Sequence, residues 1–149
     1  MDGNAARSVE ILLVEDNPGD ARLMKEALKE GEIPHQLNVV PDGELAIQYL
    51  RKVGKYEHAT RPDLIVLDLN LPKRDGRQVL EEIKRDEELR VIPVVVLTTS
   101  KATSDVNAAY QLQANCYIQK PVDLHRFWDI IRSIEGFWLN RVTLPSKLS

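Results

Sequence analysis

The sequence predicts a three-layer α/β sandwich, in which helices cover both faces of a parallel five-stranded sheet. First, short apolar runs alternate along the chain with longer segments of helical pattern. Second, the runs at 11–14, 64–67 and 94–97 are unbroken and rich in β-branched residues, which is typical of parallel strands buried on both faces. Third, 149 residues of which 43% are hydrophobic suit one domain around a single core.

The first half of the chain supplies two strand–helix pairs. After the strand at 11–14, Asn17 can cap a helix and Pro18 suits its first position. The apolar run at 37–40 is weaker, and we expect it to form an edge strand. A helix predicted over 43–51 follows it.

The second half supplies three more strand–helix pairs. They are the strand at 64–67 with a helix over 75–86, the strand at 94–97 with a helix from near Thr103, and a weaker edge strand at 116–118 with a helix over 123–135. Right-handed crossovers leave few topologies for five such pairs. The doubly wound, flavodoxin-like (βα)5 order 2-1-3-4-5 is the one expected at this length.

Composition excludes several classes of protein. A net charge of -3 gives no general attraction to nucleic acid or to an anionic membrane. No apolar run approaches the roughly 20 residues that span a bilayer. The single cysteine, Cys116, excludes an internal disulfide framework and fits a reducing compartment, so we expect a cytoplasmic protein without nucleic-acid or membrane partners.

The expected elements set the domain boundaries. We predict an N-terminal extension over 1–8, the folded domain over 9–136 and a tail over 137–149. The tail is too short for a DNA-binding output domain, and we expect it to pack on the last helix or to lie at a dimer interface. The chain is therefore expected to act as a stand-alone domain.

Chemically active side chains follow four of the expected strands. They are Glu15 and Asp16 after the first strand, Asp68 after the third, Thr98 after the fourth and Lys120 after the fifth. Because the carboxyl ends of parallel strands share one edge of the sheet, these side chains should surround one crevice.

The residue types at this crevice indicate phosphoryl chemistry with a metal ion. Crowded carboxylates repel one another unless a cation lies among them. Mg²⁺ prefers oxygen ligands and typically uses one or two carboxylates together with a phosphate. A carboxylate can attack phosphorus, and a hydroxyl and an ammonium group can then stabilise the phosphoryl oxygens.

These residues together resemble the receiver domains of response regulators in bacterial two-component systems. The resemblance rests on Glu15-Asp16, Asp68-Leu69-Asn70-Leu71-Pro72, Thr98 and Lys120-Pro121, and it covers roughly residues 9 to 135. It implies a protein that accepts a phosphoryl group from a sensor histidine kinase and then changes its partner or dimer interface. It also implies that the chain is not an enzyme, apart from slow loss of its own phosphoryl group.

The resemblance assigns roles to the acidic residues. Asp68 would be the phosphoacceptor. Asp16 and Asp68 would bind Mg²⁺, with Glu15 acting mostly through water and the backbone carbonyl of Asn70 supplying a further ligand. Glu15 departs from the aspartate that many receivers carry at this position, which leaves the arrangement of water open.

The resemblance also assigns a switch. Thr98 would hydrogen-bond the phosphoryl group and move toward it, and Tyr117 would turn inward with Thr98. Lys120 would pair with a phosphoryl oxygen, and the Lys120–Pro121 peptide would be cis. The pair Asp75-Gly76 fits the turn that opens the third helix.

The last helix carries more apolar residues than one sheet face requires. We predict an interface that this helix makes together with the expected fourth helix and fifth strand. Its residues are Tyr110, Tyr117, Phe127, Ile130, Phe137 and Trp138. A homodimer is the simplest assembly that such a face could make, and coverage by the tail is the alternative. The ending Gly136-Phe137-Trp138-Leu139 also resembles the stand-alone receivers that serve bacterial phytochrome kinases, which implies a light-regulated histidine kinase as donor.

Three other functions compete with this interpretation. A phosphohydrolase of the haloacid dehalogenase type needs a second aspartate two residues after its nucleophile, where this chain has Asn70. A flavin or nucleotide carrier on the same fold would need a glycine-rich phosphate loop after the first strand, where the chain has Glu15-Asp16-Asn17-Pro18. A receiver that acts without phosphate stays open as an alternative, although all the side chains expected for phosphorylation are present.

Overall fold

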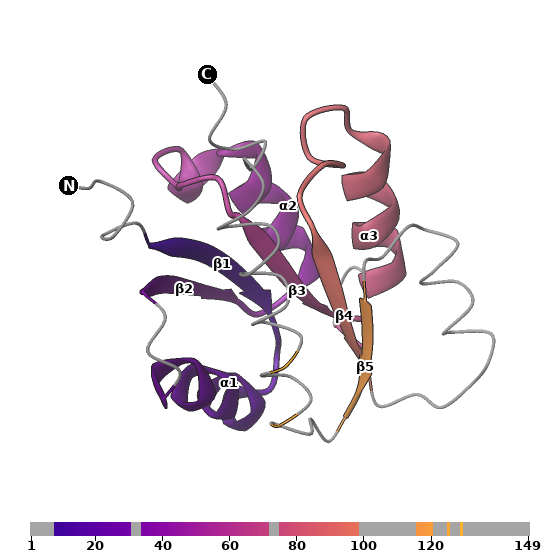
Figure 1. Cartoon of the computed structure of the whole chain (residues 1–149). Helices are drawn as coiled ribbons and strands as arrows, with labels where there is room; N and C mark the ends of the chain where they lie inside the picture. The colour runs from indigo at the N-terminus through magenta and orange to yellow at the C-terminus, as the bar shows by residue number, and fades with distance from the viewer. Residues whose placement is uncertain are drawn as a thin grey trace.

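The computed structural model contains the predicted parallel five-stranded sheet (Figure 1). The structure describes residues 8–30, 34–71, 75–98, 116–120, 125 and 129. The strands are β1 (Val9–Val14), β2 (His35–Val40), β3 (Leu64–Asp68), β4 (Val94–Thr98) and β5 (Cys116–Gln119), in the order β2-β1-β3-β4-β5. All neighbouring pairs are parallel, so the predicted strand order 2-1-3-4-5 is confirmed.

Helices flank the sheet on both sides, as a three-layer sandwich requires. They are α1 (Pro18–Glu30), α2 (Gly43–Arg51) and α3 (Gly76–Arg85), with a short 3₁₀ helix η1 (Gly54–Tyr56) after α2. In Figure 1, α1 lies on one face of the sheet, and α2 and α3 lie on the other. The helices predicted from near Thr103 and over 123–135 fall outside the described residues, as does the tail at 137–149. No helix among the described residues is long and apolar enough to cross a membrane.

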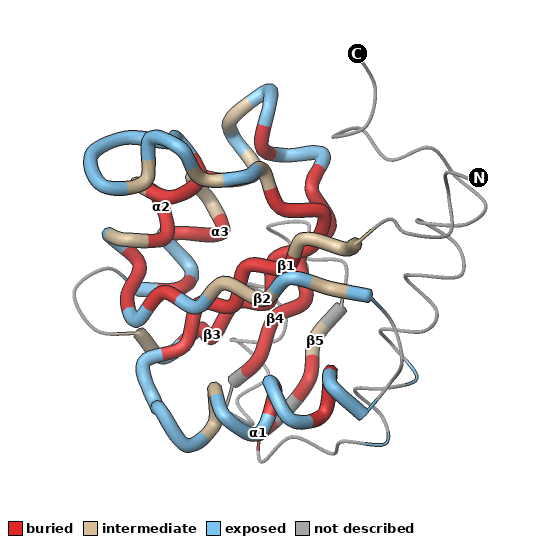
Figure 2. The backbone as a smooth tube through the Cα atoms, turned by 90° about the vertical axis from the view of Figure 1, so that its left-hand side faces the viewer, coloured by how far each residue is buried: buried red, intermediate tan, exposed pale blue. Residues whose placement is uncertain are grey.

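The alternation of side chains along each strand builds two cores. Leu12 packs with residues of α2 and α3, whereas its neighbour Leu13 packs with Met24 and Leu28 of α1. Successive residues of a strand point to opposite faces, and both faces here are covered, which explains the unbroken apolar runs. Figure 2 shows β3 and β4 buried in the middle of the molecule, the edge strand β2 mostly intermediate or exposed, and the outer side of α1 exposed.

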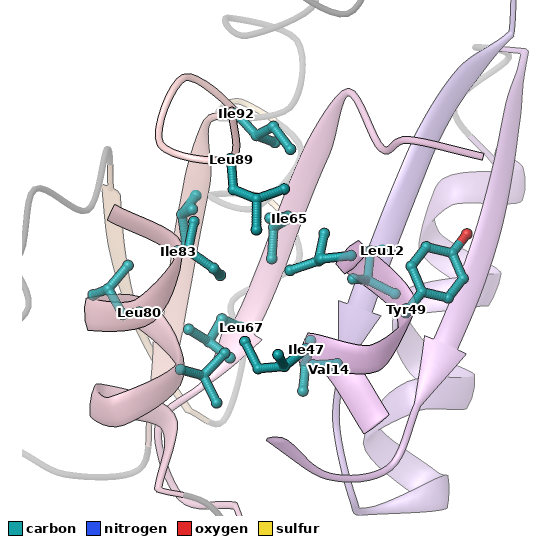
Figure 3. Packing of buried hydrophobic residues seen from close by; sticks show 14 of the residues in the cluster. Leu12, Val14, Ile47, Tyr49, Ile65, Leu67, Leu80, Ile83, Leu89 and Ile92 are labelled. Atoms are coloured by element: carbon teal, nitrogen blue, oxygen red, sulfur yellow. The ribbon is translucent and has the colours of Figure 1, made fainter. Parts of the chain in front are cut away.

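The larger core lies between the sheet and the pair α2 and α3 (Figure 3). Leu80 and Ile83 of α3 are fully buried against strand residues such as Leu67. Each such side chain contributes about 1.5–3 kcal/mol by leaving water. This packing fixes α3 against β3, whose last residue, Asp68, belongs to the predicted crevice.

Local signals in the sequence start the helices. The predicted cap Asn17 accepts a hydrogen bond from the Asp20 backbone N–H at 3.0 Å. Asp42 caps α2 through the Leu45 N–H at 2.9 Å, and Asp75 forms a capping box with Gln78 at α3. Each of these bonds satisfies a backbone donor that the helix itself leaves unpaired.

Gly76 lets α3 begin directly beside the end of β3. A Cβ atom at this position would lie 2.4 Å from the Leu69 Cα and 2.5 Å from the Asp68 carbonyl oxygen. The Gly76 N–H donates to the Leu69 carbonyl at 3.2 Å. The predicted Asp75-Gly76 turn is therefore confirmed, and only glycine fits the backbone contact that it makes.

Candidate functional site

The register of the sheet brings the predicted residues to one edge. Asp68, the last residue of β3, pairs with Leu97 of β4, and Thr98 pairs with Gln119 just before Lys120. Glu15 follows β1 and donates its backbone N–H to the Val40 carbonyl at 3.0 Å. The carboxyl ends of the four adjacent strands β1, β3, β4 and β5 thus lie at one edge of the sheet, as predicted.

Three carboxylates gather at this edge. One carboxylate oxygen each from Glu15, Asp16 and Asp68 lies within 4.8 Å of the other two. Glu15 and Asp68 are buried, and Asp16 is exposed. Hard divalent cations such as Mg²⁺ prefer such oxygen ligands, and the exposed Asp16 leaves an open side for water and phosphate. The donor set therefore fits a divalent metal ion.

The ammonium group of Lys120 lies against three carboxylates. Its Nζ atom is 2.5 Å from Glu15 Oε1, 2.9 Å from Asp68 Oδ2 and 3.0 Å from Asp20 Oδ2. The Lys120 side chain is only 7% exposed. A protonated lysine has three N–H donors, so these three contacts use its full donor capacity.

The burial of these charges shifts their pKa values. Burial raises the pKa of the Glu15 carboxyl from 4.5 to about 7; the hydrogen bond from Lys120 opposes the rise, and the Asp68 carboxylate adds to it. Burial lowers the pKa of Lys120, but its hydrogen bonds to Glu15, Asp68 and Asp20 outweigh this effect and raise the pKa above its ordinary 10.5. The lysine is therefore charged at neutral pH, and Glu15 titrates in the physiological range.

Backbone groups hold the two buried carboxylates in place. The N–H of Asn70 donates to Asp68 Oδ1 at 2.8 Å, while Asp68 Oδ2 faces Lys120. The N–H of Asn17 donates to Glu15 Oε2 at 3.2 Å. Local bonds of this kind orient a carboxylate through the two residues that follow it. Asp68 thus presents both oxygens in a fixed direction at the sheet edge.

The structure describes only some of the remaining predicted residues. Thr98 ends β4 at this edge, but its side chain lies outside the described residues. Tyr117 is partly buried and packs on the core shared with α2 and α3, and its switch role stays a prediction. Asn70 lies two residues after Asp68, as the metal role of its carbonyl requires. The other residues of the predicted interface and switch fall outside the described residues; they are Tyr110, Pro121, Phe127, Ile130, Phe137 and Trp138.

Sequence reasoning missed Asp20. Its carboxylate contacts Lys120 from the first turn of α1, across 100 residues of sequence. Asp16 precedes α1, so no helical spacing links it to Asp20, and no local pattern in the sequence marks the contact with Lys120.

A shallow hollow of about 510 Å³ adjoins the cluster. Its lining includes Glu15, Asp16, exposed residues of α1, and Val39 and Pro41 beside β2. A larger hollow of about 740 Å³ between α2 and α3 is lined by none of the site residues. Among the described residues, this hollow therefore reaches Glu15 and Asp16 from the α1 side of the sheet edge, and Asp68 does not line it.

A buried aspartate beside a carboxylate cluster and a lysine, at the carboxyl edge of a 2-1-3-4-5 sheet, is the arrangement expected of a receiver domain. The response regulator receiver domain family matches residues 11–132, and the chain belongs to this family. The predicted resemblance is confirmed.

Individual relatives are similar over nearly the whole chain. Response regulator Rcp1 of Synechocystis sp. strain PCC 6803 is 52% identical over 136 residues, which cover 91% of this chain and 92% of Rcp1. The crystal structure of the Mn²⁺-bound form of Rcp1 matches with a TM-score of 0.80 and 51% identity, over 92% of this chain and 99% of that one. The crystal structure of the phosphorylated cyanobacterial phytochrome response regulator RcpA matches with a TM-score of 0.81 and 52% identity. This match covers 93% of this chain and 99% of that one.

Proposed function

We propose that Asp68 accepts a phosphoryl group from a sensor histidine kinase in a reaction that requires Mg²⁺. The observation that carries this proposal is the position of Asp68, buried at the sheet edge between the acidic cluster and the Lys120 ammonium. Asp16 and Asp68 would hold the ion, with Glu15 acting through water and the Asn70 carbonyl supplying a further ligand. The bound ion would neutralise charge on the phosphoryl oxygens.

The transfer itself requires little beyond position and charge. A carboxylate oxygen of Asp68 forms a bond to phosphorus as the bond from phosphorus to the histidine nitrogen of the donor breaks. The electron pair stays on that nitrogen, which takes a proton from solvent, and Asp68 becomes an acyl phosphate. Lys120 donates a hydrogen bond to a phosphoryl oxygen, and Thr98 is proposed to donate a second.

Phosphorylation is proposed to act as a switch rather than to start a catalytic cycle. About two negative charges appear at the site, Thr98 and Tyr117 move toward them, and the surface near β5 changes its affinity for a partner. The partner surface is proposed to be a homodimer interface that includes Phe127, Ile130, Phe137 and Trp138. The only turnover proposed is slow self-dephosphorylation, because Asn70 stands where a phosphohydrolase would place its acid and base.

The proposed setting is a cytoplasmic phosphorelay downstream of a phytochrome-type kinase. RcpA, which is 52% identical, is described as a phytochrome response regulator, and this supports a light-regulated donor. We further propose the boundaries 1–8 for an N-terminal extension, 9–136 for the receiver domain and 137–149 for the tail.

The test is phosphotransfer measured by intact mass. The protein and its Asp68→Asn variant are incubated with Mg²⁺ and a small acyl-phosphate donor, and then with phosphorylated kinases of the phytochrome type and of an unrelated type. We expect one phosphoryl group on wild type, none on the variant, and faster transfer from the phytochrome kinase. Equal rates from both kinases would remove the phytochrome assignment, and no gain from any donor would favour the phosphate-independent alternative.

A further inference from the structure

The donor capacity of Lys120 is already full before any phosphoryl group arrives. Its three N–H groups face the carboxylates of Glu15, Asp68 and Asp20 at 2.5 to 3.0 Å. A lysine ammonium group has no further donor to offer. A phosphoryl oxygen on Asp68 can therefore gain a hydrogen bond from Lys120 only if one of these carboxylates gives up its contact.

The three carboxylates differ in what they would lose. The side chains of Glu15 and Asp68 are 0% and 4% exposed, whereas that of Asp20 is 38% exposed. A buried carboxylate that loses its counter-ion keeps an uncompensated charge, but an exposed one is rehydrated at little cost. Asp20 also lies in the first turn of α1, where the helix dipole favours a negative charge. Asp20 is thus the partner that can release Lys120 most easily.

We infer that Asp20 is a positioning residue that holds the Lys120 ammonium beside Asp68 in the unphosphorylated protein and yields its place to a phosphoryl oxygen. This inference rests on the proposed function, since it takes Asp68 as the phosphoacceptor. Asp20 belongs neither to the carboxylate triplet that fits the metal nor to the reacting group; it acts through Lys120 alone. It therefore competes with the phosphoryl group and sets how readily the phosphorylated state forms.

Removal of the Asp20 charge should then favour the phosphorylated state. The contact involves a partly exposed carboxylate, and such pairs contribute about 0.2–1 kcal/mol, which corresponds to at most about fivefold. Asp20→Asn keeps the shape of the side chain, and we expect it to bind beryllofluoride, a stable mimic of the phosphoryl group on aspartate, about 1.4- to fivefold more tightly with Mg²⁺ present. Asp20→Glu, which keeps the charge, should remain close to wild type.

Two controls separate this contact from a general change in charge. Glu30→Gln removes one negative charge from the exposed end of the same helix, about 15 Å further along the axis, and should leave the affinity unchanged. The double variant Asp20→Asn with Lys120→Met completes a mutant cycle. In the Lys120→Met background the effect of Asp20→Asn should vanish, because the residue through which Asp20 acts is gone.

A second readout needs neither metal nor phosphoryl mimic. Heteronuclear NMR of the lysine ammonium groups in metal-free protein should show a Lys120 signal protected from exchange with water. Asp20→Asn should shift that signal and increase its exchange, and Glu30→Gln should not. This measurement decides the contact even where Lys120→Met fails to fold.

The outcomes distinguish the inference from the function on which it rests. If wild type does not bind beryllofluoride, the phosphoacceptor proposal fails and the inference fails with it. If wild type binds but Asp20→Asn binds equally or more weakly, the inference alone is overturned. Persistence of the effect in the Lys120→Met background, or an equal effect of Glu30→Gln, would also overturn it. Tighter binding that requires Lys120 supports it.

Discussion

Replacement of Lys120 by methionine removes the one cation that lies among the acidic side chains of the site in the described part of the chain. Methionine keeps much of the length and the apolar surface of the lysine side chain but carries no charge. Loss of one partner from a buried ion pair costs about 3–5 kcal/mol, because the remaining charge stays buried without compensation. Glu15 and Asp68 are both buried, so we expect this full range, whereas the partly exposed Asp20 adds at most about 1 kcal/mol.

The cost should depend on pH through Glu15. Its pKa in the folded protein, about 7, lies above the ordinary 4.5, so the folded state holds this proton more tightly than the unfolded chain does. Wild-type stability from this group therefore falls as pH rises from about 4.5 to 7. Without the opposing effect of Lys120 the pKa of Glu15 rises further, so the pH range over which this group lowers stability extends upward. The contribution of Lys120 itself is fully present below pH 10.5, because its pKa is raised. We expect a larger loss at pH 8 than at pH 6.

The assay is urea denaturation of wild type, Lys120→Met and Lys25→Met in chelator. Lys25 is exposed on α1, and its replacement should change stability by less than about 0.5 kcal/mol. Mg²⁺ should recover part of the loss in Lys120→Met, about 2.7 kcal/mol at a concentration one hundred times its Kd. A loss below about 1 kcal/mol at pH 8, equal to that at pH 6, would refute the reasoning, because Lys120 would then behave as an exposed lysine.

Three further outcomes are expected. Divalent metal affinity, measured by calorimetry, should rise with pH and level off above about 7, since the raised pKa of Glu15 makes metal and proton compete; a flat profile from pH 6 to 8 would contradict this. Gly76→Ala should cost about 1–3 kcal/mol or more and slow phosphorylation, because its Cβ would lie 2.4 Å from the Leu69 Cα, whereas Gly19→Ala, with its nearest neighbour a side-chain atom at 3.2 Å, should do neither. Asp42→Ala should cost about 1 kcal/mol in thermal unfolding through the lost cap of α2 and leave phosphorylation unchanged.

The sheet could be predicted from the sequence because parallel strands buried on both faces appear as unbroken apolar runs. The runs that became β1, β3 and β4 are unbroken and β-branched, and their carboxyl ends share one edge by topology alone. The cluster of Glu15, Asp16 and Asp68 follows from that edge without any knowledge of side-chain packing. The edge strand β2 was harder to delimit: it begins at His35, two residues before the expected run, and half-exposed residues give it a weak pattern.

Sequence reasoning missed one contact between distant segments and one local turn. Asp20 meets Lys120 across 100 residues of sequence, and no local pattern marks that contact. The short helix η1 arises where Lys52 takes a left-handed conformation at the end of α2 and Gly54, also at positive φ, continues the turn. Lysine and glycine are both common residue types in loops, so neither marks this turn in the sequence. The turn is held locally, because the Lys52 N–H donates to the carbonyls of Gln48 and Tyr49.

Chemical mapping tests most directly the proposal that Asp68 carries the phosphoryl group. Borohydride reduces an aspartyl phosphate to homoserine, which marks the modified residue in a peptide map. After incubation with Mg²⁺ and an acyl-phosphate donor, we expect homoserine at position 68 in wild type and at no position in Asp68→Asn. Homoserine at another acidic residue, or an equal mass gain in Asp68→Asn, would contradict the account.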